Sequence, residues 1–278
     1  MTGHSAGAAV VTGAGRGLGS AIAAALHRDG WRVLVTDVDA EAAAAAARPL
    51  GGWATALDVR DEAACRATAA MADAADGGLR LWVNNAGILV TGPSWTHDAE
   101  TRRAVMEVNA LGAMNGTMAA LELMRPAGRG HVINIVSLTG LIAPPGEVVY
   151  AASKHALIAF SIGTLNDLRA AGETGVHISC VCPDGVWTPM LYDRLADDGA
   201  AASFTGTLLR PQRVAERVAQ LARHPRPVVS IPRWRGAQVR LLDAVPGAST
   251  RLARVVLAVG RAGQRRHARR IARHRAKE

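Results

Sequence analysis

The sequence lacks several features that would assign it at once to a particular class of protein. It has 278 residues but only three cysteines, Cys65, Cys180 and Cys182, and no Cys-x-x-Cys pair. A disulfide framework or a cysteine metal site is therefore not expected, whereas a reducing compartment such as the cytoplasm is. Residues 1–7 lack the basic and apolar regions of a secretory signal, and no run approaches the ~18 apolar residues of a membrane-spanning helix.

Lysine is also scarce, which makes each lysine informative. Only Lys154 and Lys277 occur among the 32 basic residues of the chain. In a sequence that otherwise uses arginine, a lysine in the middle of the chain indicates a position where a compact ammonium group is needed instead of a planar guanidinium. Lys154 is therefore a candidate functional residue.

The positive charge is confined to the C-terminal end of the chain. From residue 251 onward there are ten arginine and lysine residues and one acidic residue, giving +9, so the rest of the chain is neutral in total. Spaced apolar residues in the same segment predict that residues 246–278 form a basic amphipathic tail. Such a tail can pack on the body or on a partner subunit, or lie on an anionic membrane surface. Nonspecific binding to nucleic acid is a further alternative that we do not expect.

A glycine-rich turn follows the first apolar run of the chain. Residues 8–12 lead into Gly13-Ala-Gly-Arg-Gly-Leu-Gly19, and a helical pattern begins at residue 20. Strand, glycine turn and helix together are typical of a phosphate site, because the free N–H groups at the helix N-terminus attract a pyrophosphate. Asp37 ends the next apolar run, eighteen residues after Gly19. An acidic residue there can bind the ribose hydroxyls of NAD, or it can cap the helix that follows.

Apolar runs and helical patterns alternate along the chain. We predict strands over residues 8–12, 31–36, 53–57, 79–83, 131–136, 176–182 and 227–231. We predict helices over residues 20–28, 42–47, 61–75, 98–124, 147–171 and 211–223. Continuously apolar strands with short connections favour the α/β class: a doubly wound parallel sheet (a Rossmann fold) of about seven strands with helices on both faces, in one domain over residues 1–245. Ligands of such sheets bind beyond the carboxyl ends of the strands.

Tyr150 and Lys154 form the most suggestive pair of side chains. Their spacing of four residues places both on one face of the predicted helix. A fixed ammonium group favours the phenolate, so we expect Lys154 to lower the pKa of Tyr150 and to make the phenol a proton donor and acceptor. Ser137 lies at the end of the preceding strand and completes a candidate triad. The alternatives are a buried structural tyrosine and a serine that caps the strand end.

Together these residues make the chain similar to the short-chain dehydrogenase/reductase family over about residues 8–231. The resemblance is carried by Thr12 to Gly19, Asp58-Val59, Asn84-Asn-Ala-Gly87, Asn109, Ser137, Tyr150-x-x-x-Lys154 and Val186-x-Thr188-Pro189. One departure is Pro183-Asp184-Gly185, where the family usually has Pro-Gly, and we expect Asp184 to be able to reach the substrate.

The resemblance implies a role for each motif. Tyr150 would transfer the proton, Lys154 would lower its pKa and bind the nicotinamide ribose, Ser137 would hold the substrate oxygen, and Asn109 would anchor a proton-relay water. A buried amide that bonds the backbone is the alternative for Asn109. The implied cofactor-binding residues are Gly13, Arg16, Gly17, Leu18, Gly19, Asp37, Asp58, Val59, Asn85, Ala86, Gly87, Tyr150, Lys154, Pro183, Gly185, Val186 and Thr188. Asp37 favours NAD over NADP by repelling a 2′-phosphate, Arg16 acts weakly in the opposite direction, and no metal is implied.

The implied reaction is hydride transfer between NAD(H) and a secondary alcohol or ketone, and the alternative is a catalytically silent NAD-binding regulator of the same fold. Residues 138–149 and 190–210 should line the substrate pocket. Their apolar residues, with the neighbouring Trp187, are Leu138, Leu141, Ile142, Val148, Met190, Leu191, Tyr192 and Phe204. This lining favours an apolar substrate of steroid, fatty or aromatic type. The resemblance also implies a homo-tetramer or homodimer formed through the Tyr150 helix and its neighbour.

Overall fold

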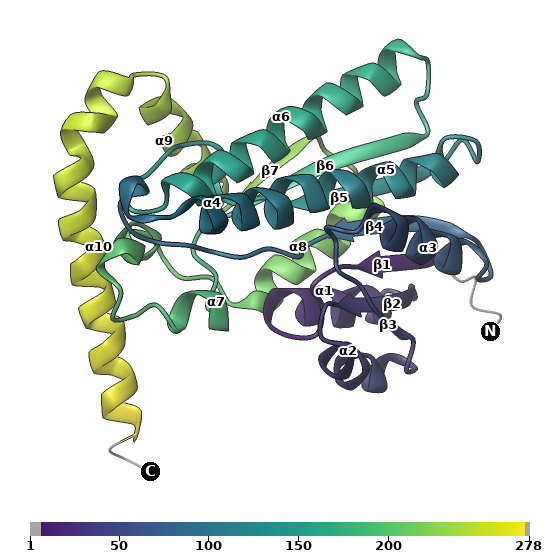
Figure 1. The fold of residues 1–278 in the computed structure, drawn as a ribbon, viewed down its shortest axis with the longest axis horizontal. Helices are drawn as coiled ribbons and strands as arrows, with labels where there is room; N and C mark the ends of the chain where they lie inside the picture. The colour runs from purple at the N-terminus through teal and green to yellow at the C-terminus, as the bar shows by residue number, and fades with distance from the viewer. Residues whose placement is uncertain (1–6, 276–278) are drawn as a thin grey trace.

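Seven parallel strands form the centre of the structure, a computed structural model that describes residues 7–275 (Figure 1). The strand order is β3-β2-β1-β4-β5-β6-β7. The strands are β1 (Ala8–Val11), β2 (Arg32–Asp37), β3 (Ala54–Ala56), β4 (Leu79–Asn84), β5 (Gly130–Ile135), β6 (Val176–Pro183) and β7 (Val228–Ile231). The predicted doubly wound sheet is confirmed, and the order reverses at β1 and β4, which is where ligands of such sheets bind.

Helices cover both faces of this sheet, as predicted. They are α1 (Gly17–Arg28), α2 (Ala40–Ala47), α3 (Glu62–Asp73), α4 (Ala99–Met106), α5 (Gly112–Met124), α6 (Val148–Ala170), α7 (Pro189–Tyr192), α8 (Pro211–Arg223), α9 (Arg233–Asp243) and α10 (Pro246–Arg275). Short 3₁₀ segments are η1 (Arg48–Leu50), η2 (Ser94–Thr96), η4 (Leu138–Gly140) and η5 (Asp198–Phe204). Figure 1 shows α1 and α8 on one side of the sheet and α3, α5 and α6 on the other.

Two apolar cores follow from this arrangement, one on each face of the sheet. The core beneath α1 and α8 includes Ile22, Leu26 and Val218, whereas the core beneath α3, α5 and α6 includes Trp82 and Leu168. Because every residue of β1 is buried, that strand is apolar along its whole length, as expected for a parallel strand covered on both faces.

The long helix predicted over residues 98–124 is interrupted in the structure. A π-helical turn, η3 (Glu107–Leu111), separates α4 from α5 and places Asn109 within it. Directly after the turn, Gly112 packs so closely against Val59 that a Cβ added to Gly112 would lie 2.5 Å from the Cγ2 atom of Val59. Periodicity alone did not reveal this turn, because a single inserted residue scarcely disturbs a helical pattern.

Helix α6 contains no long unbroken apolar run, but its average composition is as apolar as that of a membrane-spanning helix. By length and mean hydropathy it is the one helix, among the residues described, that could cross a membrane. However, α6 contacts β6 and η3, and its Lys154 is buried. A core helix of a globular protein passes the same test, and its packing identifies α6 as such a helix.

The basic C-terminal segment is a long helix that packs on the body. Helix α10 runs along η5 (Figure 1), and two of its glycines pack tightly against that segment. A Cβ added to Gly260 would lie 1.9 Å from the carbonyl oxygen of Ala201, and one added to Gly263 would lie 2.3 Å from that of Phe204. Gln264 is buried there and donates a 2.7 Å hydrogen bond to the carbonyl of Asp197. The described part of the segment therefore packs on the body; residues 276–278 of the predicted tail and residues 1–6 lie outside the described residues.

Candidate active site

A large pocket lies at the carboxyl ends of the strands. It has a volume of about 990 Å³ and opens between the glycine turn, the start of α6 and the α9–α10 segment. All the predicted cofactor residues line it, together with Ser137, Tyr150 and Lys154. Of the predicted site residues, only Asn109 is absent from the lining. Residues separated by more than 170 positions in the chain, from Gly13 to Thr188, thus meet in one cavity.

The glycine turn forms a cradle at the N-terminus of α1. Gly13 and Gly17 have φ angles of +59° and +62°, which other residues rarely adopt. An added Cβ on Gly19 would lie 2.3 Å from the Gly13 carbonyl oxygen, so this glycine is needed for the close approach of turn and helix. No side chain caps α1 and no acidic residue lies in its first turn. The N–H groups of that turn therefore fit an anionic group such as a pyrophosphate.

Asp37 lies at the end of β2 and faces the glycine turn. Its Oδ2 atom accepts a 2.9 Å hydrogen bond from the backbone N–H of Gly15, and its Oδ1 atom accepts one from Asp39. The cap of α2 is Asp39 instead, which accepts hydrogen bonds from the N–H groups of Glu41 and Ala42. The alternative interpretation of Asp37 as the helix cap is therefore wrong, and its carboxylate is held in the pocket wall.

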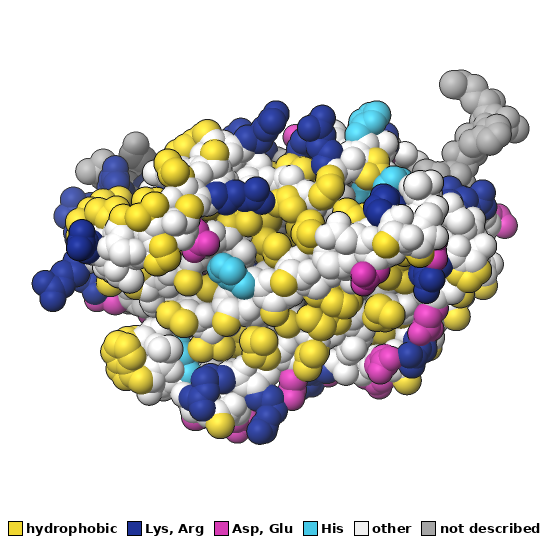
Figure 2. Space-filling model, turned by 90° about the horizontal axis from the view of Figure 1, so that it is seen from above, with side chains coloured by type: hydrophobic (Ala, Val, Ile, Leu, Met, Phe, Trp, Pro, Cys, Tyr) yellow, Lys and Arg dark blue, Asp and Glu magenta, His cyan; other side chains and the backbone are white. Residues whose placement is uncertain are grey.

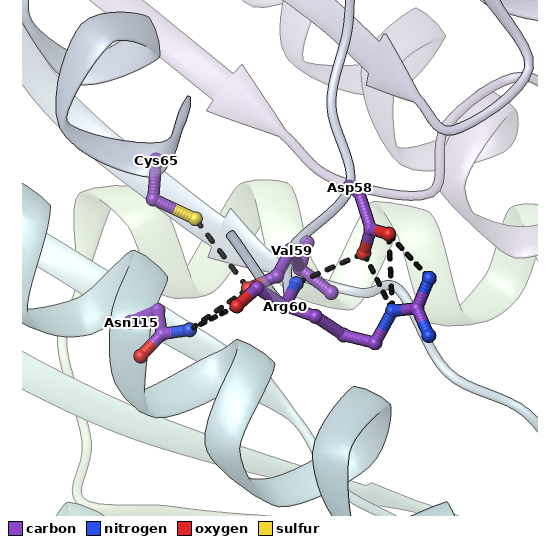
Figure 3. Close-up of polar contacts among 5 residues, drawn as sticks. All are labelled: Asp58, Val59, Arg60, Cys65 and Asn115. Atoms are coloured by element: carbon purple, nitrogen blue, oxygen red, sulfur yellow. Dashed lines mark hydrogen bonds and ion pairs between the residues drawn. The ribbon is translucent and has the colours of Figure 1, made fainter. Parts of the chain in front are cut away.

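Two further predicted residues, Asp58 and Val59, line the pocket where β3 meets α3. Figure 3 shows Asp58 bonded to the guanidinium of Arg60, with a shortest distance of 2.6 Å, and this contact lowers the pKa of Asp58. The carbonyl of Val59 accepts hydrogen bonds from Asn115 and from the thiol of Cys65. Arg60 also lines the pocket and was not predicted, because a lone exposed arginine carries no motif signal.

Asn85 joins the glycine turn to the sheet. Its Nδ2 atom donates hydrogen bonds of 2.9 Å to the carbonyls of Thr12 and Gly13. The hydroxyl of Thr12 in turn accepts hydrogen bonds from the N–H groups of Asn85 and Ala86. These contacts fix two of the loops that line the pocket relative to each other.

The predicted triad converges at the start of α6. The Ser137 hydroxyl lies close enough to the Tyr150 phenol to oppose the rise in its pKa. Ser137 also caps η4 through the N–H of Thr139, so the structural alternative for this serine holds as well. The Nζ atom of Lys154 lies 5.7 Å from the centre of the Tyr150 ring and donates a 3.0 Å hydrogen bond to the carbonyl of Ile135.

The pKa of Tyr150 departs from the expected direction. Burial, with a smaller contribution from the charge of Glu147, raises this pKa above its usual value, while the neighbouring Ser137 hydroxyl opposes the rise. Lys154 does not lower it here, because its ammonium group is directed at the Ile135 carbonyl. Burial also lowers the pKa of Lys154 to about 8. At neutral pH this geometry therefore presents a protonated phenol, which is a proton donor.

Asn109 lies behind the pocket wall. Its amide pairs with the backbone of Ile88, accepting from its N–H at 2.8 Å and donating to its carbonyl at 2.9 Å. It also donates to the hydroxyl of Ser153, one residue before Lys154. The backbone-bonding alternative therefore describes its side chain, which holds the loop after β4 against α6.

Asp184 forms an ion pair and is not free to act as a separate ligand. Its Oδ2 atom lies 2.9 Å from Nε of Arg235, and both side chains are largely buried. Arg235 also contacts Thr205 and Gln238. The extra residue between Pro183 and Gly185 thus ties the loop after β6 to α9, and the carboxylate still lines the pocket.

The pocket walls differ in part from the predicted lining. Leu138, Ile142, Met190 and Leu191 line the cavity as predicted, whereas Leu141, Val148, Trp187, Tyr192 and Phe204 do not. The ring of Trp187 stacks on His267 of α10, and Phe204 packs near the same histidine. These aromatic residues instead anchor the α7–η5 segment to α10.

Helices α9 and α10 supply a wall that sequence reasoning missed. The apolar lining residues from them are Val239, Leu242, Leu252, Val255, Val256 and Val259. Their spacing was visible in the sequence, but the arginines between them suggested a separate tail. Glu147 was also missed: it lines the pocket, is buried, and burial raises its pKa to about 7.

The fold, the glycine cradle and the triad define a class of protein, the dinucleotide-binding oxidoreductases. The sequence model for short chain dehydrogenases matches residues 7–199. The chain is 35% identical over 204 residues to the sex determination protein tasselseed-2 of Zea mays, covering 70% of this chain and 60% of that protein. It is 35% identical over 208 residues to the L-fucose dehydrogenase of Bos taurus, covering 73% and 75%.

A solved structure agrees with these sequence matches. The structure is similar to that of a short-chain dehydrogenase/reductase from Burkholderia phymatum in complex with NAD, with a TM-score of 0.77, 28% identity, and coverage of 87% of this chain and 94% of that one. The chain belongs to the short-chain dehydrogenase/reductase family of oxidoreductases.

Proposed function

We propose that this protein transfers a hydride between NAD(H) and a secondary alcohol or ketone. The observation that carries the proposal is the convergence of Ser137, Tyr150 and Lys154 in the same cavity as the glycine cradle of α1. Each of these side chains alone could have a purely structural role. Their common position beside the glycine cradle is what favours a catalytic role.

The three side chains suit the proton half of this reaction. Ser137 and Tyr150 together hold the substrate oxygen, and Tyr150 donates its proton when a ketone is reduced and recovers it when an alcohol is oxidised. Lys154, whose ammonium is held by the carbonyl of Ile135, would bind the ribose of the nicotinamide half of the cofactor. Asn109 acts as a positioning residue through Ile88 and Ser153. A nicotinamide cofactor would supply or accept the hydride.

Asp37 supports NAD as the cofactor over NADP. The glycine cradle would hold the pyrophosphate, and Asp58 and Val59 would flank the adenine. The Asp37 carboxylate would receive the ribose hydroxyls and repel a 2′-phosphate. Arg16 and Arg60 also line the pocket and pull toward NADP. However, Arg60 is already paired with Asp58, so we propose NAD.

The walls of the cavity support an apolar substrate. Ile142, Met190, Leu191 and the valines of α10 surround the space next to Tyr150. A ring system or alkyl chain of steroid, fatty or aromatic type would fill it. The alternative function, a catalytically silent regulator, gives no reason for Ser137, Tyr150 and Lys154 to line the same cavity as the glycine cradle.

The test is the Tyr150→Phe variant of the full-length protein, assayed with NAD and NADP against a panel of secondary alcohols and ketones. Removing the hydroxyl should lower kcat by roughly a hundredfold or more while the cofactor still binds. The matched control is Tyr192→Phe, since Tyr192 is the only other tyrosine and its ring packs on Trp187 outside the pocket lining. That variant should keep its turnover within about twofold.

Normal turnover by Tyr150→Phe would refute the assignment. A wild-type protein that binds NAD but converts no member of the panel would favour the regulator. A higher kcat/KM with NADP than with NAD would overturn the cofactor proposal alone.

We also propose a homodimer or homotetramer built through α5 and α6. Leu111, Met118 and Val148 are exposed on this side of the molecule. Figure 2 looks onto the α6 side and shows hydrophobic side chains across its middle, with arginines toward the margins. Covering such a surface with a second copy removes apolar area from water. We place the protein in the cytoplasm, in contact with a membrane surface through α9 and α10.

A further inference from the structure

A buried carboxyl group lies at one end of the pocket without a full set of partners. Glu147 is 1% exposed. Its Oε1 atom accepts a 2.6 Å hydrogen bond from the hydroxyl of Ser203. Its Oε2 atom is buried and has no hydrogen-bond partner among the described residues. An unpaired buried oxygen is costly, so such an atom in a pocket wall points to a group supplied by a ligand.

The backbone holds this carboxyl group in a fixed place. Gly146 has a φ angle of +85°, and an added Cβ there would lie 2.2 Å from the carbonyl oxygen of Gly199, so the turn fits tightly against η5. The carbonyl of Gly146 accepts a 2.8 Å hydrogen bond from Gly92, and the carbonyl of Glu147 accepts one from Ala151 in the first turn of α6. The position of Glu147 is therefore built into the fold.

No cation neutralises Glu147 within the described part of the chain. Two guanidinium groups of the pocket wall are committed elsewhere, Arg235 to Asp184 and Arg194 to Asp197. Asp184 and Asp197 are instead close enough for their charges to act on Glu147. These contacts leave the carboxyl group in an environment that repels anions.

The hydrogen-bond polarity of the pair selects the kind of ligand. Because Ser203 donates its proton to Glu147, its oxygen presents only lone pairs to the pocket. The Oε2 atom accepts a hydrogen bond when the group is ionised and donates one when it is protonated. A hydroxyl group matches either form because it both donates and accepts, whereas a carboxylate or phosphate would also meet the charges of Asp184 and Asp197. An ammonium group would stand in a cavity that already holds Lys154 and would require full ionisation of a buried acid. A hydroxyl group meets neither objection.

Glu147 is also close to the reacting centre. It is the N-cap residue of α6, three residues before Tyr150, and its charge acts on the Tyr150 phenol. A donor bound to Glu147 would thus lie on the Tyr150 side of the cavity.

We propose that Glu147 and Ser203 bind a second hydroxyl group of the substrate. The substrate class is then a diol or hydroxyketone on an otherwise apolar skeleton, with its two oxygens separated by a short stretch of carbon. This inference rests on the proposed function and narrows its substrate.

The first experiment compares kcat/KM of the full-length protein for cyclohexanol and for the cis and trans isomers of cyclohexane-1,2-diol and cyclohexane-1,3-diol. We expect the best diol to exceed cyclohexanol by at least about tenfold, because the mono-alcohol leaves the buried acceptors unpaired. In Glu147→Leu this ratio should fall to within about threefold of unity. In the matched control Glu216→Leu, at an exposed position of α8, the ratio should stay at its wild-type value. If Glu147→Leu does not fold, Ser203→Ala replaces it in this comparison, because it removes a single oxygen of the pair and should also lower the ratio.

A second experiment does not depend on turnover. Binding of the same alcohols to the NAD-loaded Tyr150→Phe protein is measured by ligand-observed NMR, with and without Glu147→Leu. If a diol binds more tightly than cyclohexanol and Glu147→Leu abolishes that difference, the result supports the inference. It does so even where the turnover assay has refuted the proposed function. Equal affinity for diol and mono-alcohol overturns it. Binding of 3-aminocyclohexanol at least about tenfold tighter than the diol also overturns it, by assigning an ammonium ligand.

Discussion

Glu147 carries an energetic cost that depends on pH. Its pKa is raised from 4.5 to about 7, with burial as the main cause. Below about pH 4.5 the group is protonated in both the folded and the unfolded chain. As the pH rises toward 7, the unfolded chain loses the proton first, so the free energy of unfolding falls across this window. Such a cost is tolerated at sites where a buried acceptor serves binding.

The Glu147→Gln variant should remove this dependence. The free energy of unfolding of wild type relative to the variant should fall by about 3 kcal/mol between roughly pH 4 and roughly pH 8. Urea unfolding at the two pH values measures the difference, and Glu216→Gln, exposed on α8, is the control. His131, whose pKa is lowered by burial, titrates equally in all three proteins and cancels. The prediction would be contradicted if the free energies of unfolding of wild type and Glu147→Gln changed by the same amount between the two pH values.

Individual residues were predictable where they belong to a motif. The glycines, Asp37, Ser137, Tyr150 and Lys154 have fixed spacings to neighbouring elements, and all of them line the pocket. Glu147 and Ser203 are separated by 56 residues and belong to no pattern. The direction of the Tyr150 pKa shift was also out of reach, because it depends on how deeply the phenol is buried and on where the ammonium of Lys154 points.

At the scale of elements, the sequence indicated the strands well and the C-terminal segment poorly. Continuous apolar runs identified all seven strands to within one or two residues. The π-turn η3 was hidden, since an inserted residue leaves the helical pattern intact. The amphipathic spacing of α10 was visible in the sequence. Only the structure shows that its small residue Gly260 packs against η5.

The packing of α10 can be tested with two glycines of the same helix. Gly260→Ala places a Cβ 1.9 Å from the Ala201 carbonyl oxygen, whereas Gly247→Ala meets nothing within 4 Å. The first variant should lose about 1–3 kcal/mol of stability and become more sensitive to trypsin at the arginines of α10. The second should be neutral or slightly stabilising, because alanine favours the helix. Urea unfolding and limited proteolysis measure both, and equal behaviour would show that α10 does not rely on this contact.

At the scale of the whole molecule, charge and apolar surface meet on the outer side of α9 and α10. Trp234, Leu241 and Val245 are exposed there and lie outside the pocket lining. Exposed arginines surround them, including Arg233 and Arg240. A basic surface with protruding apolar side chains matches an anionic bilayer, which attracts the arginines and accepts the apolar groups.

Vesicle pelleting of the full-length protein tests this contact. We expect binding to vesicles that contain phosphatidylserine, weak binding to neutral vesicles, and a decrease at high salt. Trp234→Ser with Leu241→Ser should weaken binding by at least about tenfold, because both side chains lose their burial in the bilayer. Trp95→Ser removes a tryptophan of η2 that is even more exposed than Trp234 and should have little effect. Absence of pelleting, or pelleting independent of lipid charge, would exclude the membrane contact.

The wall that α10 contributes to the pocket has a consequence for synthesis. The glycine cradle and the proposed catalytic side chains precede residue 155, while Leu252, Val255 and Val259 belong to α10, which follows all seven strands of the sheet. A ribosome-bound nascent chain can therefore assemble its sheet and its cofactor cradle before the substrate cavity has all its sides. The cavity gains its last wall only when α10 has been made and has packed on η5.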